Sequence, residues 1–138
     1  MNAAIYWDTS AIISTLFQDA HTEAAQRAKK RKAFHILSSL AIAETLAIIS
    51  RIERGLMSTL PTFSASAARE ALERGPWHYL DQVPDREILQ DLAQRCSLRG
   101  ADLWHLACAK TLTIDVPELE LITFDHHLSV AAQSVLAK

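Results

Sequence analysis

Short apolar runs that alternate with longer helical segments constrain the fold of this chain more than any other feature. Residues 3–7 and 119–124 are such runs, and an aspartate directly follows each of them. Residues 34–37 form a third run. These runs are too continuous to leave one face of a sheet in water, so helices should cover both faces. The predicted fold class is therefore α/β, a three-layer domain with a central, mainly parallel sheet flanked by helices.

Helical patterns fill most of the chain between these runs. They predict helices over residues 11–17, 21–31, 40–54, 64–74, 85–95, 101–112 and 126–137. Ser38 or Ser39 can cap the third of these helices, and Gly55 suits the left-handed conformation just after its end. Pro61 interrupts the pattern, and residues 78–83 are expected to form a short edge strand.

Length and composition narrow the class of protein. A chain of 138 residues can bury a core without disulfides, so residues 1–138 are expected to form one domain. Its formal net charge of −2 argues against the broad basic surface of a non-specific duplex DNA binder. Cys96 and Cys108 match no zinc-site spacing and are expected to be free thiols. Since no membrane span or signal peptide is recognisable, we expect a soluble, cytoplasmic protein.

Three aspartates occupy positions where such a sheet gathers a ligand site, which lies outside the carboxyl ends of parallel strands. Asp8 ends the first predicted strand, Asp125 ends the last, and Asp102 stands near the start of a helix. Each has a simpler explanation, because Asp8 and Asp125 can cap helices and Asp102 can favour a helix dipole. Their common position favours a shared site.

Glu44 lies on an apolar helix face. Its neighbours three and four residues away are Leu40, Ala41, Ala47 and Ile48. Either its carboxylate reaches water at the edge of that face, or it is buried and needs a proton or a cation. No Lys or Arg lies within one turn, so a bound metal would supply the missing charge.

The acidic residue types indicate the chemistry. Oxygen ligands suit Mg²⁺ or Mn²⁺ and do not suit zinc. Such an ion, held by a few carboxylates, activates water and neutralises charge on a phosphoryl group. Hydrolysis of a phosphate ester is the implied reaction. His105 lies on the same helix side as Asp102, and we expect a hydrogen-bonded packing residue there rather than a metal ligand.

The four acids lie in the segments IYWDTSAIISTLF, SSLAIAETLAII, RGADLWHLACA and LITFDHHLSVAA. These segments resemble the acidic motifs of PIN-domain ribonucleases, especially the VapC-like toxins of bacterial type II toxin–antitoxin pairs. The resemblance spans nearly the whole chain, although residues 51–79 match poorly. It implies a PIN-like domain with the first strand inside the sheet, and a Mg²⁺- or Mn²⁺-dependent endoribonuclease that hydrolyses RNA.

Residue by residue, the resemblance implies a catalytic set of four acids: Asp8, Glu44, Asp102 and Asp125. Asp8, Asp102 and Asp125 would hold the metal, whereas Glu44 would bind it directly or through water.

Other residues have supporting positions. Ser10 and Thr123 fall at the family's small hydroxyl positions, and His105 falls where the family often has a histidine. Arg99 precedes the third acid and is a candidate phosphate contact. The basic run at residues 29–32 could touch phosphates or form only a solvated surface.

The resemblance also implies partners: an RNA substrate, a cognate antitoxin protein and a second copy in a homodimer. We expect Ile13, Phe17 and Ile48 to contribute to an apolar surface for the antitoxin. One alternative is a PIN-fold module that binds RNA or a partner protein without cutting. The second alternative is a phosphatase that uses Asp8 as its nucleophile. Phosphatases of the haloacid dehalogenase type, however, carry an Asp where this chain has Ser10.

Overall fold

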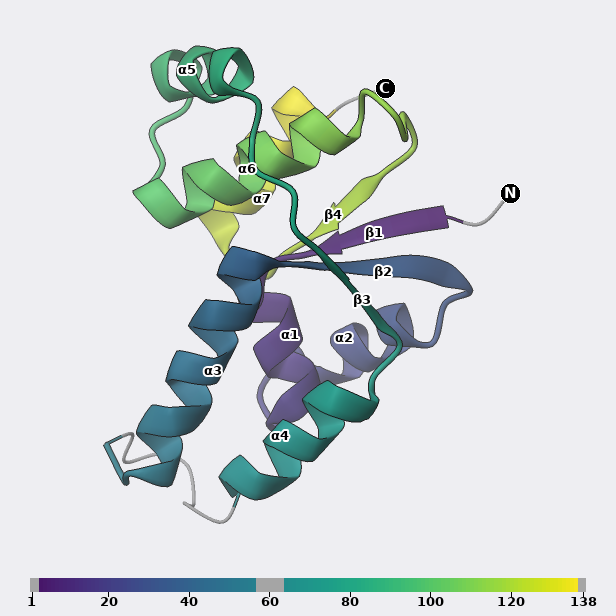
Figure 1. Ribbon diagram of the computed structural model, residues 1–138, viewed down its shortest axis with the longest axis vertical. Coiled ribbons are helices and arrows are strands. Elements are labelled where there is room, and N and C mark those ends of the chain that lie inside the picture. Colours follow the sequence, from purple (N-terminus) through teal and green to yellow (C-terminus); the bar gives the residue numbers. More distant parts are fainter. Residues whose placement is uncertain (1–2, 57–63, 137–138) are drawn as a thin grey trace.

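A parallel sheet forms the centre of the protein, whose computed structural model describes residues 3–56 and 64–136 (Figure 1). Within these residues the sheet has four strands in the order β3-β2-β1-β4. They are β1 (Ala3–Trp7), β2 (Ala33–Ser38), β3 (Trp77–Leu80) and β4 (Glu120–Ile122). All neighbouring strands run parallel, so β1 lies inside the sheet and β3 at an edge, as predicted.

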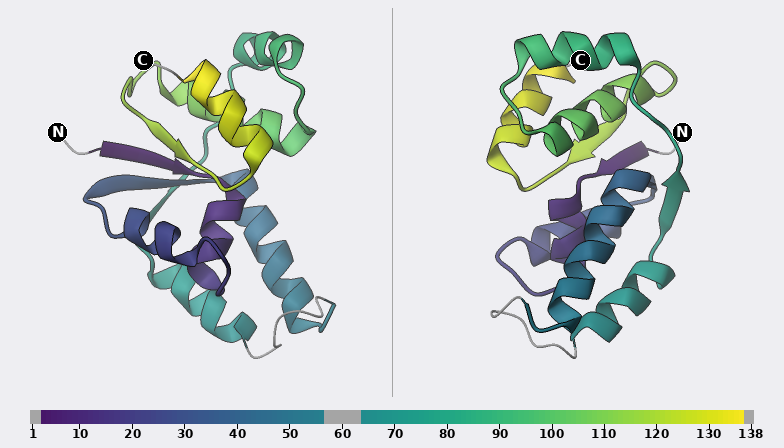
Figure 2. Two further views of the ribbon diagram at one scale, coloured as in Figure 1. Left: turned by 180° about the vertical axis from the view of Figure 1, so that it is seen from behind. Right: turned by 60° about the vertical axis from the view of Figure 1, so that its left-hand side comes forward.

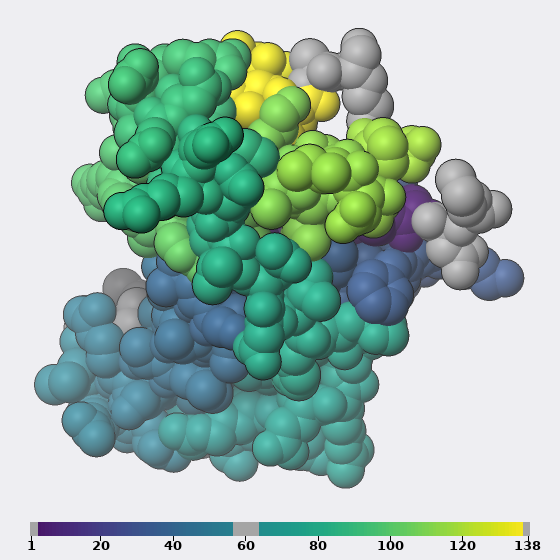
Figure 3. Space-filling model, turned by 45° about the horizontal axis from the view of Figure 1, so that its top comes forward, coloured from purple at the N-terminus to yellow at the C-terminus, as the bar shows by residue number. Residues whose placement is uncertain are grey.

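Helices cover both faces of the sheet, which confirms the three-layer α/β class (Figure 2). One layer contains α1 (Thr9–Leu16), α2 (Thr22–Lys29), α3 (Ser39–Glu53) and α4 (Ser64–Arg74). The other contains α6 (Gly100–Leu112) and α7 (His126–Val135), with α5 (Arg86–Arg95) packed on α6. Residues 81–85, between β3 and α5, run over the surface from one layer to the other (Figure 3). The expected break at Pro61 lies outside the described residues.

Alternation along β1 explains why its sequence is apolar throughout. Successive side chains of a strand point to opposite faces. Ile5 and Trp7 pack into the core beneath α1, α3 and α4, whereas Ala4 and Tyr6 pack into the core beneath α6. All four are buried, because neither face of the strand meets water.

Most of the apolar surface expected on the first helices is buried inside the molecule. Phe17 is only 7% exposed and belongs to the core, so its predicted role in antitoxin binding is wrong. Ile13 and Ile48 are half-buried and pack against the same core. The reason is that α1 and α3 pack on each other and on α2 and α4, as well as on the sheet.

Local signals set several boundaries. The Ser38 hydroxyl accepts a hydrogen bond from the Ala41 amide at 3.1 Å, so Ser38 rather than Ser39 caps α3. Gly55 follows α3 with a φ of 70°, as expected for a left-handed helix end.

Cys96 and Cys108 are free thiols. None of the helices in the described segments has both the length and the apolar character to cross a membrane.

Candidate active site

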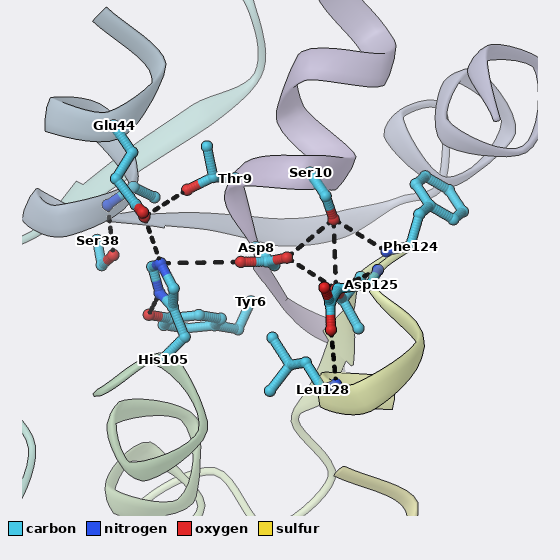
Figure 4. Close-up of polar contacts among 12 residues, drawn as sticks. Tyr6, Asp8, Thr9, Ser10, Ser38, Glu44, His105, Phe124, Asp125 and Leu128 are labelled. Atoms are coloured by element: carbon cyan, nitrogen blue, oxygen red, sulfur yellow. Dashed lines mark hydrogen bonds and ion pairs between the residues drawn. The ribbon is translucent and has the colours of Figure 1, made fainter. Parts of the chain in front are cut away.

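Asp8 directly follows β1, at the edge of the sheet where the strands end (Figure 4). It occupies the N-cap position of α1, but its side chain makes no capping hydrogen bond. Instead its Oδ2 accepts hydrogen bonds from Ser10 Oγ at 2.8 Å and Thr123 Oγ1 at 2.7 Å. The side chain is buried, with Asp8 only 4% exposed. Helix capping therefore does not explain Asp8.

The two hydroxyls that hold Asp8 also shape the turn after β4. Ser10 Oγ accepts a hydrogen bond from the Phe124 amide at 3.0 Å, and Thr123 Oγ1 accepts one from the Asp125 amide at 3.1 Å. These bonds hold the chain in a turn, which explains why β4 ends at Ile122 rather than at residue 124. Ser10 and Thr123 thus lie together beside the first acid, as the resemblance implied.

Asp125 has a capping role as well as its place at the site. It follows the turn after β4, and its Oδ1 accepts a hydrogen bond from the Leu128 amide of α7 at 2.9 Å. Since β1 and β4 are parallel neighbours, Asp8 and Asp125 share one edge of the sheet. The second oxygen, Oδ2, has no hydrogen-bond donor among the described residues.

Glu44 reaches this edge from α3. Its Oε1 accepts hydrogen bonds from Thr9 Oγ1 at 2.7 Å and His105 Nε2 at 2.8 Å, and its side chain is 33% exposed. The bond from His105, more than that from Thr9, lowers the pKa of the Glu44 carboxyl, although burial opposes it. Contrary to the expectation from the sequence, Glu44 therefore does not need a metal for its charge, because hydrogen-bond donors and water already stabilise the carboxylate.

His105 connects the site with the core. It is a hydrogen-bonded, buried residue, as expected, with Nδ1 2.7 Å from the Tyr6 hydroxyl. Its Nε2 also lies 3.8 Å from Asp8 Oδ1. Sequence reasoning did not single out Tyr6, yet a signal existed. Tyr6 of β1 and Asp8, whose backbone is still extended, are two residues apart, so their side chains point to the same face of the sheet.

Asp102 stands in the first turn of α6. Burial raises the pKa of its carboxyl, and the nearby carboxylates of Asp125, Asp8 and Glu44 raise it further, while His105 opposes them. No donor to the Asp102 carboxylate occurs in the part of the chain that the structure describes. The four carboxylates at this edge therefore carry more negative charge than the groups around them neutralise.

The donor chemistry fits a hard divalent cation, although the side chains do not form a closed cage. Among residues 3–56 and 64–136, no three His, Cys, Asp or Glu side chains form a group that could hold a metal ion. Mg²⁺ usually takes only one or two carboxylates and keeps several waters. Excess negative charge and free carboxylate oxygens therefore fit such an ion with water completing its ligands.

Of the remaining charged residues considered for the site, some lie near the four acids and others lie at the opposite end of the strands. Arg99 is exposed at the start of α6, near Asp102. The basic run at residues 29–32 lies before β2, at the opposite end of the strand from the acids, so its placement favours a solvated surface. Sequence reasoning also missed a further acid, Asp81. It follows β3 at the end of the strands where the four acids lie, which we call the acidic edge, and it accepts a hydrogen bond from Ser39 Oγ at 2.6 Å.

The chain is similar to known proteins over most of its length. A family model of the PIN domain matches residues 5–133. Ribonuclease VapC46 of Mycobacterium tuberculosis is 29% identical over 136 residues, which cover 96% of this chain and 93% of that protein. The crystal structure of M. tuberculosis VapC20, described as a toxin that cleaves the sarcin–ricin loop, matches with a TM-score of 0.61. That match has 15% identity, covers 93% of this chain and 95% of the other, and concerns the fold alone.

Proposed function

Because the chain belongs to the PIN-domain family, we propose that it is a Mg²⁺- or Mn²⁺-dependent endoribonuclease, the toxin of a type II toxin–antitoxin pair. The convergence of four acids at one edge of the sheet carries this proposal. The ribonuclease name of VapC46 supports RNA as the substrate.

The four acids share two tasks in this proposal, metal binding and orientation of the attacking water. Asp8, Asp102 and Asp125 would hold the metal, in part through its bound water molecules, and Glu44 would bind it directly or through water. A bound divalent ion would supply a more acidic water and offset charge on the phosphate. The Ser10 and Thr123 hydroxyls keep Asp8 Oδ2 fixed at 2.8 and 2.7 Å, so Asp8 needs little rearrangement to act as a ligand.

Glu44 would orient the attacking water. The hydrogen bonds to its Oε1 favour the ionised carboxylate, which can only accept hydrogen bonds. Its Oε2 has no donor among the described residues and can accept from a water molecule. Arg99, exposed beside the site, would contact a substrate phosphate.

The proposal extends to partners and place of action. As the resemblance to VapC-like toxins implies, we further propose a cognate antitoxin protein, a homodimer and action in the cytoplasm, with residues 1–138 acting as one PIN domain. Light scattering on the purified protein measures the dimer directly, and a monomer at micromolar concentration would contradict it.

RNA cleavage tests the central proposal. We expect the purified protein to cut at least one RNA in a labelled panel of tRNA, rRNA fragments and mRNA with Mg²⁺ or Mn²⁺, and none with EDTA. Asp8→Asn keeps the side-chain shape but removes the charge of a metal ligand. It should lower the cleavage rate by more than ~100-fold, since even outer-shell changes cost ~10–100-fold.

Asp91→Asn is the matched control. Asp91 is an exposed acid of α5 that pairs with Arg95 at 2.9 Å, away from the acidic edge. This variant should cut RNA at the wild-type rate. Cleavage that persists in EDTA or in Asp8→Asn would contradict the metal-dependent mechanism, and metal-independent RNA binding without cutting would favour a binding module.

A further inference from the structure

Two buried side chains continue the acidic site into the core, and the proposed reaction does not itself use them. They are Tyr6 of β1, which is 0% exposed, and His105 of α6, which is 1% exposed. The Tyr6 hydroxyl meets His105 Nδ1 at 2.7 Å, and His105 Nε2 meets Glu44 Oε1 at 2.8 Å (Figure 4). Three elements that are distant in sequence are thus joined by two short hydrogen bonds.

The donors in this chain can be assigned from its two ends. Glu44 as a carboxylate can only accept, so the His105 nitrogen that faces it, Nε2, carries a proton. A neutral imidazole has one protonated nitrogen, which leaves Nδ1 as an acceptor. The Tyr6 hydroxyl, which keeps its proton in this buried position, donates to it. For neutral His105 the order of donation is therefore Tyr6 to His105 to Glu44.

We propose that Tyr6 and His105 are positioning residues for Glu44, an inference that rests on the proposed function of the same site. Tyr6 selects the Nε2–H tautomer of His105 and fixes its ring. His105 then holds Glu44 Oε1, which leaves Oε2 for the metal or its water. The Nε2–H group also faces Asp8 Oδ1 at 3.8 Å, so one donor stands between two acids that repel each other.

On the opposite face of β1, Trp7 and His35 form a similar pair, but this pair leads to a backbone carbonyl oxygen and not to an acid. Trp7 Nε1 donates to His35 Nδ1 at 3.0 Å, and His35 Nε2 lies 3.0 Å from the Arg31 carbonyl oxygen. His35 is 1% exposed, like His105. Both histidines are therefore oriented by an aromatic residue of β1, but only His105 is directed at an acid. The pair of Trp7 and His35 provides a matched structural control.

Three measurements at one fixed pH test the proposal. Nitrogen-15 NMR of the metal-free protein reports the His105 tautomer, calorimetry reports the Kd for Mn²⁺, and RNA cleavage reports kcat and KM. In wild type we expect the Nε2–H tautomer alone. Tyr6→Phe should give a mixture of tautomers, weaken Mn²⁺ binding by ~10-fold or more and lower kcat by a similar factor. KM should stay nearly constant, because substrate contacts are unchanged.

Further variants separate positioning from stability. His105→Gln keeps an N–H donor and should retain more Mn²⁺ affinity and kcat than His105→Leu. His35→Gln removes an equally buried ring and should lower the melting temperature while leaving the Kd for Mn²⁺ and kcat at wild-type values.

Several outcomes would overturn the proposal. One is a His105 tautomer and Mn²⁺ affinity in Tyr6→Phe equal to those of wild type, and another is an equal loss of Mn²⁺ affinity in His35→Gln. If wild type cuts no RNA, the proposed function fails, while the tautomer and the Mn²⁺ Kd still decide the positioning role. If Tyr6→Phe does not fold, equal Mn²⁺ affinity in His105→Gln and His105→Leu is the contradicting result.

Discussion

Each acid at the site has its own local environment, although all four are carboxylates. Asp8 accepts two hydroxyl hydrogen bonds, Glu44 accepts one from a hydroxyl and one from an imidazole, and Asp125 caps a helix. Asp102 has no such donor among the described residues, and its pKa is raised by burial and by the other carboxylates. Electrostatic strain in the metal-free site should therefore be concentrated at Asp102.

Asp102→Asn tests this strain. The raised pKa of Asp102 means that the folded protein binds a proton there more tightly than the unfolded chain does, so protonation of Asp102 stabilises the fold. This stabilisation is fully present below pH 3.8, the ordinary pKa. It is lost as pH rises through the raised folded-state pKa. Above that window, in EDTA, Asp102→Asn should melt at the wild-type temperature or a few degrees higher. Mn²⁺ should reverse the order, since it stabilises the form that binds it better.

Glu87→Gln is the control for a helix-dipole role. Glu87 is the first-turn acid of α5, and its loss should destabilise the protein by ~0.3–1 kcal/mol in both buffers. If Asp102→Asn shows the same uniform loss in thermal melts with EDTA and with Mn²⁺, the repulsion argument is wrong and Asp102 mainly serves its helix.

Short connections after the strands place three of the proposed catalytic side chains: Asp8, Glu44 and Asp125. α1 begins at Thr9, directly after Asp8, and α3 begins at Ser39, directly after β2. Glu44 then lies five residues into α3, close enough to the sheet edge to meet Thr9 and His105. The start of α3 therefore determines where Glu44 lies.

Ser38→Ala should weaken that start. The substitution removes the hydroxyl that accepts from the Ala41 amide, and N-cap losses of this kind cost about 1 kcal/mol. The free energy of unfolding from urea titration should fall by that amount. The neighbouring Ser39→Ala alters only an exposed hydroxyl that donates to Asp81, so its effect should stay within ~0.5 kcal/mol. Equal losses in both variants would contradict the assignment of the cap to Ser38.

The central strand β1 connects the two helical layers of the protein. Ile5 and Trp7 belong to one core, Ala4 and Tyr6 belong to the other, and β1 pairs with both β2 and β4. Neither layer can lose its packing without exposing the strand that supports the other layer.

We therefore expect one cooperative unfolding transition for residues 1–138. Differential scanning calorimetry should give a calorimetric enthalpy equal to the van't Hoff enthalpy, as for other small single domains. The metal-free protein is the suitable sample, because tightly bound metal can distort the comparison. Two resolved transitions would show that the layers unfold separately and would contradict the single-domain prediction.

Most of the architecture could be predicted from the sequence. Continuous apolar runs predict strands covered on both faces, and caps and glycines mark helix ends within a few residues. The observed strands, helices and parallel sheet follow these signals. The acids at strand ends could also be predicted to share an edge, because that follows from parallel pairing alone.

The groups that stabilise each acid could not be predicted in this way, because they meet only in the folded protein. The partners of Glu44 and Asp8 lie up to 115 residues away, and no local pattern reports such contacts. The same limit explains the wrong expectation for Phe17, since helix periodicity reveals an apolar face but not the helix that packs against it. Periodicity and capping depend on neighbours in the chain, whereas hydrogen-bond partners, burial and pKa depend on neighbours in space.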